Sequence, residues 1–277
     1  MITEYLNHLS LKMATTCKQV DYGYGSTNGP HTWCLTCSAA AGARQSPINI
    51  VRHRCVEDLS LGSIKIVSLQ NVSELFTRKK HNFQVSFANK KASFVEGGPL
   101  KGRYYLQQFH CHWGCEDGWG SEHQIDGRSF GGELHLVFMN EKHNSIEEAT
   151  RDSEGLCVIG VFFKVDNTEN LQIKPLIDVI KSSKPNSEQP INEYIDVKHL
   201  IPSLSRYFTY EGSLTTPPCA ECVRWIICAE PLRISTEQLA AMRTMHCCND
   251  CNTNENFRPP LPLGKRKVTC SFSQNLH

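Results

Sequence analysis

Short apolar and alternating segments dominate the hydrophobic pattern of the chain, and they predict β-strands. Successive side chains of a strand point to opposite faces, so a period of two indicates a half-buried strand. A continuous apolar run indicates a strand that is buried on both faces. The predicted strands are INIV (48–51), SIKIV (63–67), FQVSF (83–87), YYLQQFHCHW (104–113), ELHLVF (133–138), LCVIGVFF (156–163) and VRWIIC (223–228).

Helical periodicity is sparse and is found in two segments. One helix is predicted to begin at Ser235, where Ser-Thr-Glu-Gln forms a capping box and Leu239, Met242 and Met245 follow at helical spacing. A shorter helix is predicted to start near Pro175. Its apolar side would consist of Leu176, Ile177, Val179 and Ile180.

No internal repeat, low-complexity tract or Pro/Ser-rich linker divides the chain. The fold class is therefore predicted to be mainly β (α+β), in a single domain over residues 21–277 with short peripheral helices. Residues 1–20 show weak periodicity and are expected to form a loosely ordered N-terminal arm.

Two of the predicted strands place histidines on one face. Alternation puts Gln108, His110 and His112 on the same side of the first strand, and Glu133 and His135 on the same side of the second. The opposite sides are apolar or aromatic. They carry Phe109, Cys111 and Trp113 on the first strand, and Leu134, Leu136 and Phe138 on the second.

Three imidazoles on one sheet face predict a catalytic zinc site. Zinc held by three neutral imidazoles keeps a fourth position for water, whereas structural zinc sites are usually closed by thiolates. Gln108 and Glu133 each lie two residues from a proposed ligand, where they could accept the spare ring N–H and fix its tautomer. The alternative is that these are ordinary polar residues of a strand, packed or exposed.

Charge and composition exclude some classes of partner. The 277 residues include 29 basic and 28 acidic side chains, with a net charge of +1 and no concentrated basic stretch, so a nucleic-acid partner is not expected. The first residues lack the apolar region of a signal peptide, and no later run is long enough to span a bilayer. We expect a cytoplasmic protein without membrane contact; an incomplete N-terminus would leave secretion open.

The 14 cysteines are numerous for such a protein. A disulfide set is one interpretation, but a chain of this length does not need cross-links to hold its core, so mostly reduced thiols are expected. Two CxxC pairs, Cys34/Cys37 and Cys248/Cys251, lie far apart in the sequence and are interpreted as unlinked thiols rather than a structural zinc site.

Eight motifs occur in order along the chain: YGYGSTNGPHTW (22–33), QSPINI (45–50), GGPLKGRYYLQQFHCHWG (97–114), GSEH (120–123), ELHLV (133–137), GLCVIGVFF (155–163), GSLTTPPC (212–219) and NFRPP (256–260). Through these motifs the sequence resembles the α-class carbonic anhydrases, from about residue 21 to 272. The resemblance implies a single domain around a large, twisted, mostly antiparallel central sheet, with zinc at the bottom of a conical cleft. It also implies reversible hydration of carbon dioxide to bicarbonate and a proton by a zinc-bound hydroxide.

The resemblance assigns roles to individual residues. His110, His112 and His135 match the positions of the zinc ligands, and Gln108, Glu133 and Asn256 match positions that support those ligands. Thr215 matches the residue that aims the hydroxide and donates its own proton to Glu122, which can only accept when it is ionised. The apolar wall for carbon dioxide would consist of Val137, Val158, Leu214, Val223 and Trp225, with Thr216 beside Thr215.

A proton shuttle is also implied. His81 falls on the family's shuttle position, and histidine is the side chain whose ordinary pKa suits that task. Lys79 and Lys80 depart from the small or amide residues common there and are expected to lower the pKa of His81. Tyr24 and Gln84 match further polar positions that line the cleft.

Several residues depart from the family pattern. Cys111, Phe138 and Met139 replace other side chains next to the ligands, which predicts altered packing more than altered chemistry. Exported members often join a cysteine to the position of Cys219; Ala40 stands at the usual partner's position and Cys37 lies three residues away, so that disulfide is not expected.

The alternatives belong to different functional classes. One is a carbonic anhydrase-related binding module without activity, although all three histidines, Thr215 and Glu122 are present. Another is a different zinc hydrolase such as a peptidase, but the chain has no HExxH motif. A monomer with one zinc is expected, acting on carbon dioxide and bicarbonate and inhibited by sulfonamides and anions as the family is.

Overall fold

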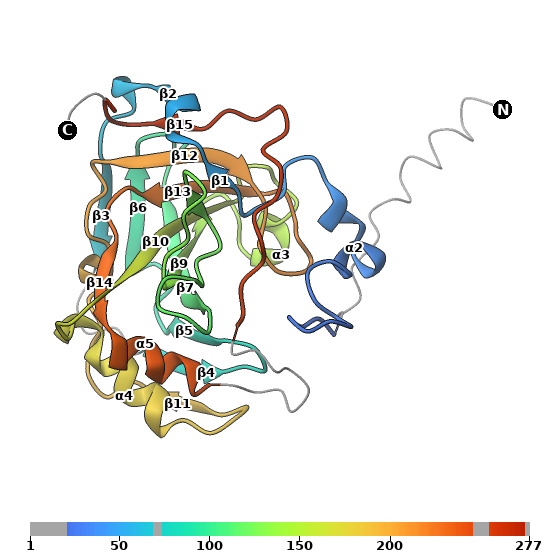
Figure 1. The fold of residues 1–277 in the computed structure, drawn as a ribbon. Helices are drawn as coiled ribbons and strands as arrows, with labels where there is room; N and C mark the ends of the chain where they lie inside the picture. The colour runs from blue at the N-terminus through green and yellow to red at the C-terminus, as the bar shows by residue number, and fades with distance from the viewer. Residues whose placement is uncertain (1–20, 69–73, 246–254, 275–277) are drawn as a thin grey trace.

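A sheet of 13 strands forms the body of the protein (Figure 1). The computed structural model describes residues 21–68, 74–245 and 255–274, and every count below refers to them. The main strand order is β11-β4-β5-β7-β9-β10-β13-β12-β15-β2, with β14 paired to β10, β6 to β7 and β3 to β6. Most pairs are antiparallel, while β10 pairs in parallel with β13 and β14, and β15 with β2. The mainly β, mostly antiparallel fold is confirmed.

The strands of this sheet are short except for three in its middle. They are β2 (Val56–Glu57), β3 (Ile64–Ser68), β4 (Glu74–Arg78), β5 (Phe83–Phe87), β6 (Ser93–Gly97), β7 (Tyr104–Trp113), β9 (Gly132–Asn140), β10 (Leu156–Asp166), β11 (Glu188–Pro190), β12 (Tyr207–Gly212), β13 (Val223–Cys228), β14 (Leu232–Ser235) and β15 (Thr269–Cys270). A separate parallel pair joins β1 (Asn49–Ile50) to β8 (Gln124–Ile125).

All seven predicted strands are present, and several others escaped the hydrophobic pattern. In β4 the charged Glu74 and Arg78 are buried on the same face as Phe76, whereas the apolar Leu75 is 39% exposed. This strand is buried like the interior of a sheet, but two of its buried positions hold charged residues. Periodicity of apolar residues therefore could not reveal it.

The helices lie at the periphery (Figure 1). They are α2 (Trp33–Thr36), α3 (Ile146–Ala149), α4 (Lys174–Ser182) and α5 (Thr236–Arg243), with 3-10 turns η1 (Ser38–Ala41), η2 (Arg52–Arg54), η3 (Leu59–Leu61), η4 (Leu171–Ile173) and η5 (Val197–Leu200). The predicted capping box is confirmed, since the Ser235 hydroxyl accepts from the Gln238 N–H and the Gln238 side chain accepts from the Ser235 N–H. The expected length order was wrong: α4 has nine residues and α5 has eight.

A β-bulge in β7 sets which side chains face the core. The register of β7 against β9 shifts between Leu106 and Gln108, so one extra residue reverses the alternation at that point. An uninterrupted period of two would have put Leu106 on the same face as His110. Instead, one apolar cluster contains residues from both sides of the bulge, namely Tyr104, Leu106, Phe109, Cys111 and Trp113.

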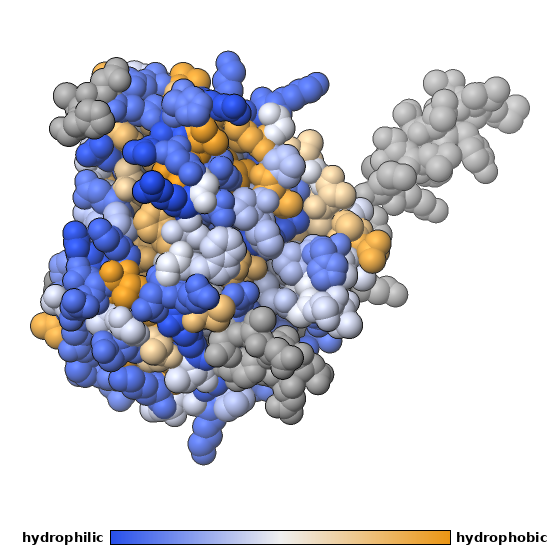
Figure 2. All heavy atoms as spheres, in the orientation of Figure 1, coloured by the Kyte–Doolittle hydropathy of each residue, from blue (hydrophilic) through white to orange (hydrophobic). Residues whose placement is uncertain are grey.

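Some of the sequence expectations concern residues that the structure does not describe. The N-terminal arm and the Cys248/Cys251 pair lie outside the described residues. Within the described part of the chain, no helix combines the length and apolar character needed to cross a bilayer. Figure 2 shows hydrophilic residues over most of one face, with hydrophobic residues in small separate groups.

Candidate metal centre

Three histidines from two neighbouring strands converge on one point. His110 of β7 lies directly opposite His135 of β9, and His112 lies two residues further along the same face of β7. The ring centroids are 4.7 Å apart for His112 and His135, and 5.1 Å apart for His110 and His112. One nitrogen from each ring lies within 4.8 Å of the other two, which is the geometry of a group that could hold a metal ion.

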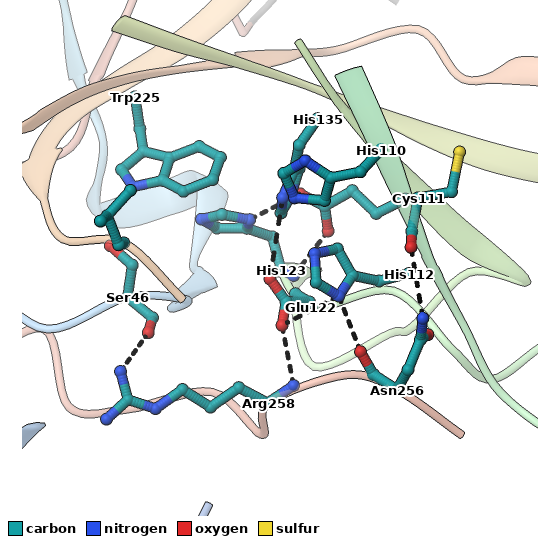
Figure 3. A network of polar contacts seen from close by, with 12 residues as sticks. Ser46, His110, Cys111, His112, Glu122, His123, His135, Trp225, Asn256 and Arg258 are labelled. Atoms are coloured by element: carbon teal, nitrogen blue, oxygen red, sulfur yellow. Dashed lines mark hydrogen bonds and ion pairs between the residues drawn. The ribbon is translucent and has the colours of Figure 1, made fainter. Parts of the chain in front are cut away.

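The second nitrogen of each ring is held by a different partner, and Figure 3 shows the partner of His112, the carbonyl oxygen of Asn256. His110 Nδ1 lies 2.9 Å from Gln108 Oε1, and His135 Nε2 lies 2.8 Å from Glu133 Oε1. His112 Nδ1 lies 2.7 Å from the carbonyl oxygen of Asn256. Each partner is an acceptor, so each ring carries its proton on that nitrogen and turns a lone pair toward the common point.

These donors fit zinc. His112 Nε2 is buried and has no hydrogen-bond partner among the described residues. A buried polar nitrogen of this kind costs free energy unless something binds it. Burial lowers the pKa of His112, and burial together with the charges of His112 and His135 lowers that of His110 well below its usual range. Neutral imidazole is the form that binds zinc, and three of them leave one position open.

A buried hydrogen-bond chain fixes His135 from behind. Glu133 Oε1 lies 2.7 Å from His123 Nδ1, and Glu133 Oε2 accepts from the His123 backbone N–H. His123 Nε2 lies 2.6 Å from the Tyr210 hydroxyl, which donates to Ser46 Oγ. Sequence reasoning missed the role of His123, Tyr210 and Ser46, although His123 is part of the GSEH motif.

The same chain explains a second cluster of potential ligands. His123, Glu133 and His135 also lie close enough together to hold a metal. Both ring nitrogens of His123 are already used in hydrogen bonds, and the two oxygens of Glu133 accept from His123 and His135. This cluster is therefore a support for the first one.

Close packing on β10 holds Glu133 in place. Gly160 pairs with His135 across the sheet, and a Cβ atom at Gly160 would lie 2.8 Å from Glu133 Oε1 and 2.8 Å from Ile227 Cδ1. Only glycine leaves room here for the carboxylate that supports His135.

Glu122 and Thr215 are both buried close to the histidines. Glu122 Oε1 accepts from the Arg258 backbone N–H at 2.8 Å. Glu122 Oε2 lies 3.9 Å from His135 Nδ1 and has no hydrogen-bond partner among the described residues. One carboxylate oxygen is thus fixed, and the other is an acceptor that is still open.

Beside the histidines lies a cleft of about 320 Å³. Val137, Val158 and Trp225 occupy paired positions on β9, β10 and β13, so they form one apolar row across the sheet. Leu214, Thr215, Thr216, Gln84 and Gln108 also line the cleft. Sequence reasoning missed five lining residues: Ser86, Lys90, Gln107, Ile146 and Leu156.

Two predicted residues do not line this cleft among the described residues. Val223 is fully buried in the apolar cluster that contains Val158 and Trp225. Tyr24 packs edge-on against Trp33, and its ring centroid lies 5.9 Å from that of His81.

His81 is also not among the described residues that line the cleft. Its ring packs against Tyr22 and Tyr24, each at 5.9 Å between centroids. Burial lowers the pKa of His81, and the charge of Lys80 lowers it further. The sequence predicted this direction from both lysines, but the main cause is burial, and Lys80 is itself paired with Asp21 at 2.8 Å.

The departures around the ligands affect packing. Cys111 and Phe138 are fully buried in the apolar cluster on the far face of β7 and β9, and Met139 packs partly buried against the other cluster. Cys37 is buried with its thiol donating to the Pro218 carbonyl, whereas Cys34 is exposed.

Comparison with known proteins now decides the family. The model of the eukaryotic-type carbonic anhydrases matches residues 28–272. This chain belongs to that family. Carbonic anhydrase 7 of Mus musculus is 38% identical over 257 residues, which cover 91% of this chain and 97% of that protein. Carbonic anhydrase 3 of Homo sapiens is 35% identical over 260 residues, which cover 91% of this chain and 98% of that protein.

Family membership confirms the resemblance that the motifs predicted. The carbonic anhydrase family is zinc-dependent, and the three histidines of this chain form a group able to bind a metal ion. The structure brings together the predicted ligands with Gln108, Glu133 and Asn256.

Proposed function

We propose that this protein catalyses the reversible hydration of carbon dioxide to bicarbonate and a proton, with one zinc ion held by His110, His112 and His135. The observation that carries the proposal is the buried Nε2 of His112, which has no hydrogen-bond partner among the described residues. It lies close to one nitrogen each of His110 and His135, and hydrogen bonds fix the tautomers of those two rings. When bound, zinc supplies the Lewis acidity that brings the pKa of a coordinated water near neutrality, as is established for carbonic anhydrases.

The residues around the histidines then orient the reaction. Glu122 is fixed through Oε1 by the Arg258 N–H, and its open Oε2 would accept the Thr215 hydroxyl proton. An ionised carboxylate cannot donate, so Thr215 must donate to it and accept from the attacking oxygen. Two groups thereby aim one lone pair of the nucleophile at the substrate.

The apolar row receives the neutral substrate. Val137, Val158 and Trp225, with Leu214, offer no hydrogen bond that would compete for carbon dioxide. Val223 would act from behind this row by packing. The row borders His135, so a molecule lying on it is next to the nucleophile.

A proton must leave the site in each turnover, and we assign this to His81. Its lowered pKa keeps it neutral at physiological pH, so it is able to accept a proton. The same low pKa makes it a weaker acceptor than an unperturbed histidine. Proton transfer is therefore expected to be the slow part of turnover in weak buffer.

The test is a pair of histidine variants on zinc-quantified protein. His112→Ala should lose zinc and lower stopped-flow carbon dioxide hydration to the uncatalysed background. His53→Ala, on the exposed turn η2, is the control and should keep both its zinc and its hydration rate. A sulfonamide should inhibit both this control and the wild type. If His112→Ala keeps its zinc and its rate, the proposed metal centre is wrong. If the wild type binds zinc but gives no hydration, the chain is an inactive binding module.

A further inference from the structure

Arg258 holds Glu122 with its backbone and a second segment of the chain with its side chain. Its N–H donates to Glu122 Oε1 at 2.8 Å, and one guanidinium nitrogen donates to Gln45 Oε1 and to the Ser46 carbonyl oxygen, each at 2.9 Å. Figure 3 shows the bonds to Glu122 and to Ser46. The other terminal nitrogen donates to the Ala40 carbonyl oxygen at 3.2 Å. One residue thus joins the Glu122 carboxylate to residues 40–46.

The buried charge of Arg258 makes these contacts costly to break. The residue is 2% exposed and forms no ion pair with any described residue. Its charge is therefore stabilised by the three oxygens and by the face of Trp33, whose ring centroid lies 5.5 Å from the guanidinium carbon. A planar guanidinium reaches several acceptors in a fixed geometry that an ammonium does not reproduce. We expect residues 40–46 to be held firmly against Arg258.

The same segment also holds the end of the strand that leads to Thr215. The Ser46 N–H donates to Ser213 Oγ at 2.9 Å, and the Ser213 N–H donates to Ser46 Oγ at 3.0 Å. Both serines are fully buried. A Cβ atom at Gly212 would clash with Ser46 Oγ, so glycine permits this close approach at the end of β12. The Ser213 carbonyl accepts from Trp225 Nε1 at 3.0 Å, which fixes the chain two residues before Thr215.

We propose that residues 40–46 form a clamp that sets the position of Thr215 relative to Glu122, with Arg258 and Ser213 as its positioning residues. Glu122 Oε2 has no hydrogen-bond partner among the described residues, so the spacing between the two groups is set by what holds each of them. Arg258 holds Glu122, Ser213 holds the chain before Thr215, and the clamp bonds both. Its role in catalysis rests on the proposed function, in which Thr215 donates to Glu122.

The kinetic test removes one hydroxyl from the clamp's contact. In Ser213→Ala the Ser46 N–H loses its acceptor, so we expect kcat/KM for carbon dioxide to fall about 10- to 100-fold, as for a small misplacement of a reacting group. In weak buffer kcat should fall less, because proton transfer is expected to limit it. Zinc affinity should be unchanged, because Ser213 supports none of the three histidines. Ser235→Ala is the matched control, since Ser235 is also buried and accepts a backbone N–H, but at the cap of α5.

Amide hydrogen exchange, followed by NMR on the protein as purified, tests the clamp without catalysis. In Ser213→Ala the Arg258 N–H should exchange about 2- to 10-fold faster, the effect of weakening one hydrogen bond, although the link between these residues runs through Ser46. Arg258→Lys should speed exchange of the Ser213 N–H to a similar extent, and it tests the coupling from the other end should Ser213→Ala not fold. Both amides should keep wild-type exchange in Ser235→Ala.

The clamp and the proposed function fail in different ways. If the wild type hydrates carbon dioxide but Ser213→Ala keeps its kcat/KM, the clamp is wrong and the proposed function stands. A loss of kcat/KM with unchanged exchange of the Arg258 N–H also overturns the clamp, because Ser213 would then act on Thr215 alone. If the wild type gives no hydration but the reciprocal exchange effects are seen, the proposed function fails and the coupling through residues 40–46 stands.

Discussion

Two buried glutamates, in different regions of the sheet, differ in almost everything but their burial. Glu133 in β9 is fully buried and receives hydrogen bonds from the His123 backbone, His123 Nδ1 and His135 Nε2. Glu74 in β4 is 5% exposed and receives one N–H, from Ile195 at 3.3 Å, while its Oε1 has no partner among the described residues.

The pKa values of these carboxyl groups diverge accordingly. Burial alone would raise both. The charges and hydrogen bonds of His123 and His135 nevertheless hold the pKa of Glu133 well below its usual range. Burial raises the pKa of Glu74 to about 8, against only one opposing hydrogen bond. Whether a buried carboxyl group is charged therefore depends on the hydrogen-bond donors around it rather than on how deeply it is buried. In this sheet such donors surround Glu133, behind the metal ligands.

Breaking the well-supported site should give the largest effect. Glu133→Gln places an N–H₂ group where the carboxylate accepted from N–H donors on both oxygens. We expect the unfolding free energy to fall by about 3 kcal/mol, as for a broken buried charge network. Zinc affinity, measured by competition with a chelator, should fall about 10- to 100-fold. Glu211→Gln, on an exposed side chain of β12, is the control; equal affinity in both variants would contradict the account.

Removing the poorly supported carboxyl should stabilise the protein at high pH. The pKa of Glu74 is about 8 in the folded state against an ordinary 4.5, so the unfolded chain loses this proton first as pH rises. Its contribution to stability is therefore complete below about pH 4.5 and is lost progressively up to about pH 8. Urea unfolding of Glu74→Gln should lack this loss, which is on the order of 4 kcal/mol at pH 8. Parallel pH profiles for the variant and the wild type would refute this.

Crowding the Glu133 carboxylate from the neighbouring strand β10 should have a smaller effect. In Gly160→Ala the added Cβ would lie 2.8 Å from Glu133 Oε1, so the carboxylate or β10 must move. A destabilisation of about 2 kcal/mol is expected, together with weaker zinc binding. Gly118→Ala is the matched control, since a Cβ there meets nothing within 4 Å. Equal melting temperatures for Gly160→Ala and Gly118→Ala would contradict this packing argument.

The smallest effect is expected at the exposed end of the site. In Lys80→Gln the pKa of His81, followed by the NMR titration of its ring protons, should rise because a nearby positive charge is gone. It should still remain below the ordinary value of 6.5, because burial is the larger cause. Recovery of the full ordinary value would mean that charge, rather than burial, controls this histidine.

The metal centre was predictable from the sequence because a strand has a fixed period. Alternation alone placed His110, His112 and Gln108 on one face, and the same rule placed Glu133 with His135. Asn256 could be found only through the family resemblance, since its carbonyl reaches His112 from 144 positions away.

Other features depend on contacts that a periodic pattern does not encode. The bulge before Gln108 changes the alternation within one strand. The pattern of β4 hides a strand because two of its three buried residues, Glu74 and Arg78, are charged. The chain from Glu133 through His123 to Tyr210 joins three separate segments. The sequence offered one clue to this hydrogen-bond chain, namely His123, which follows Glu122 in the GSEH motif. Only Glu122 of that motif had been assigned a role.

The most direct test of the central claim is a titration of metal-free protein with zinc while the initial rate of carbon dioxide hydration is recorded by stopped flow. The account predicts that the rate rises linearly and stops rising at one zinc per chain. If zinc binds with that stoichiometry and the rate stays at the uncatalysed background, the three histidines hold a metal without supporting hydration, and the claim is contradicted.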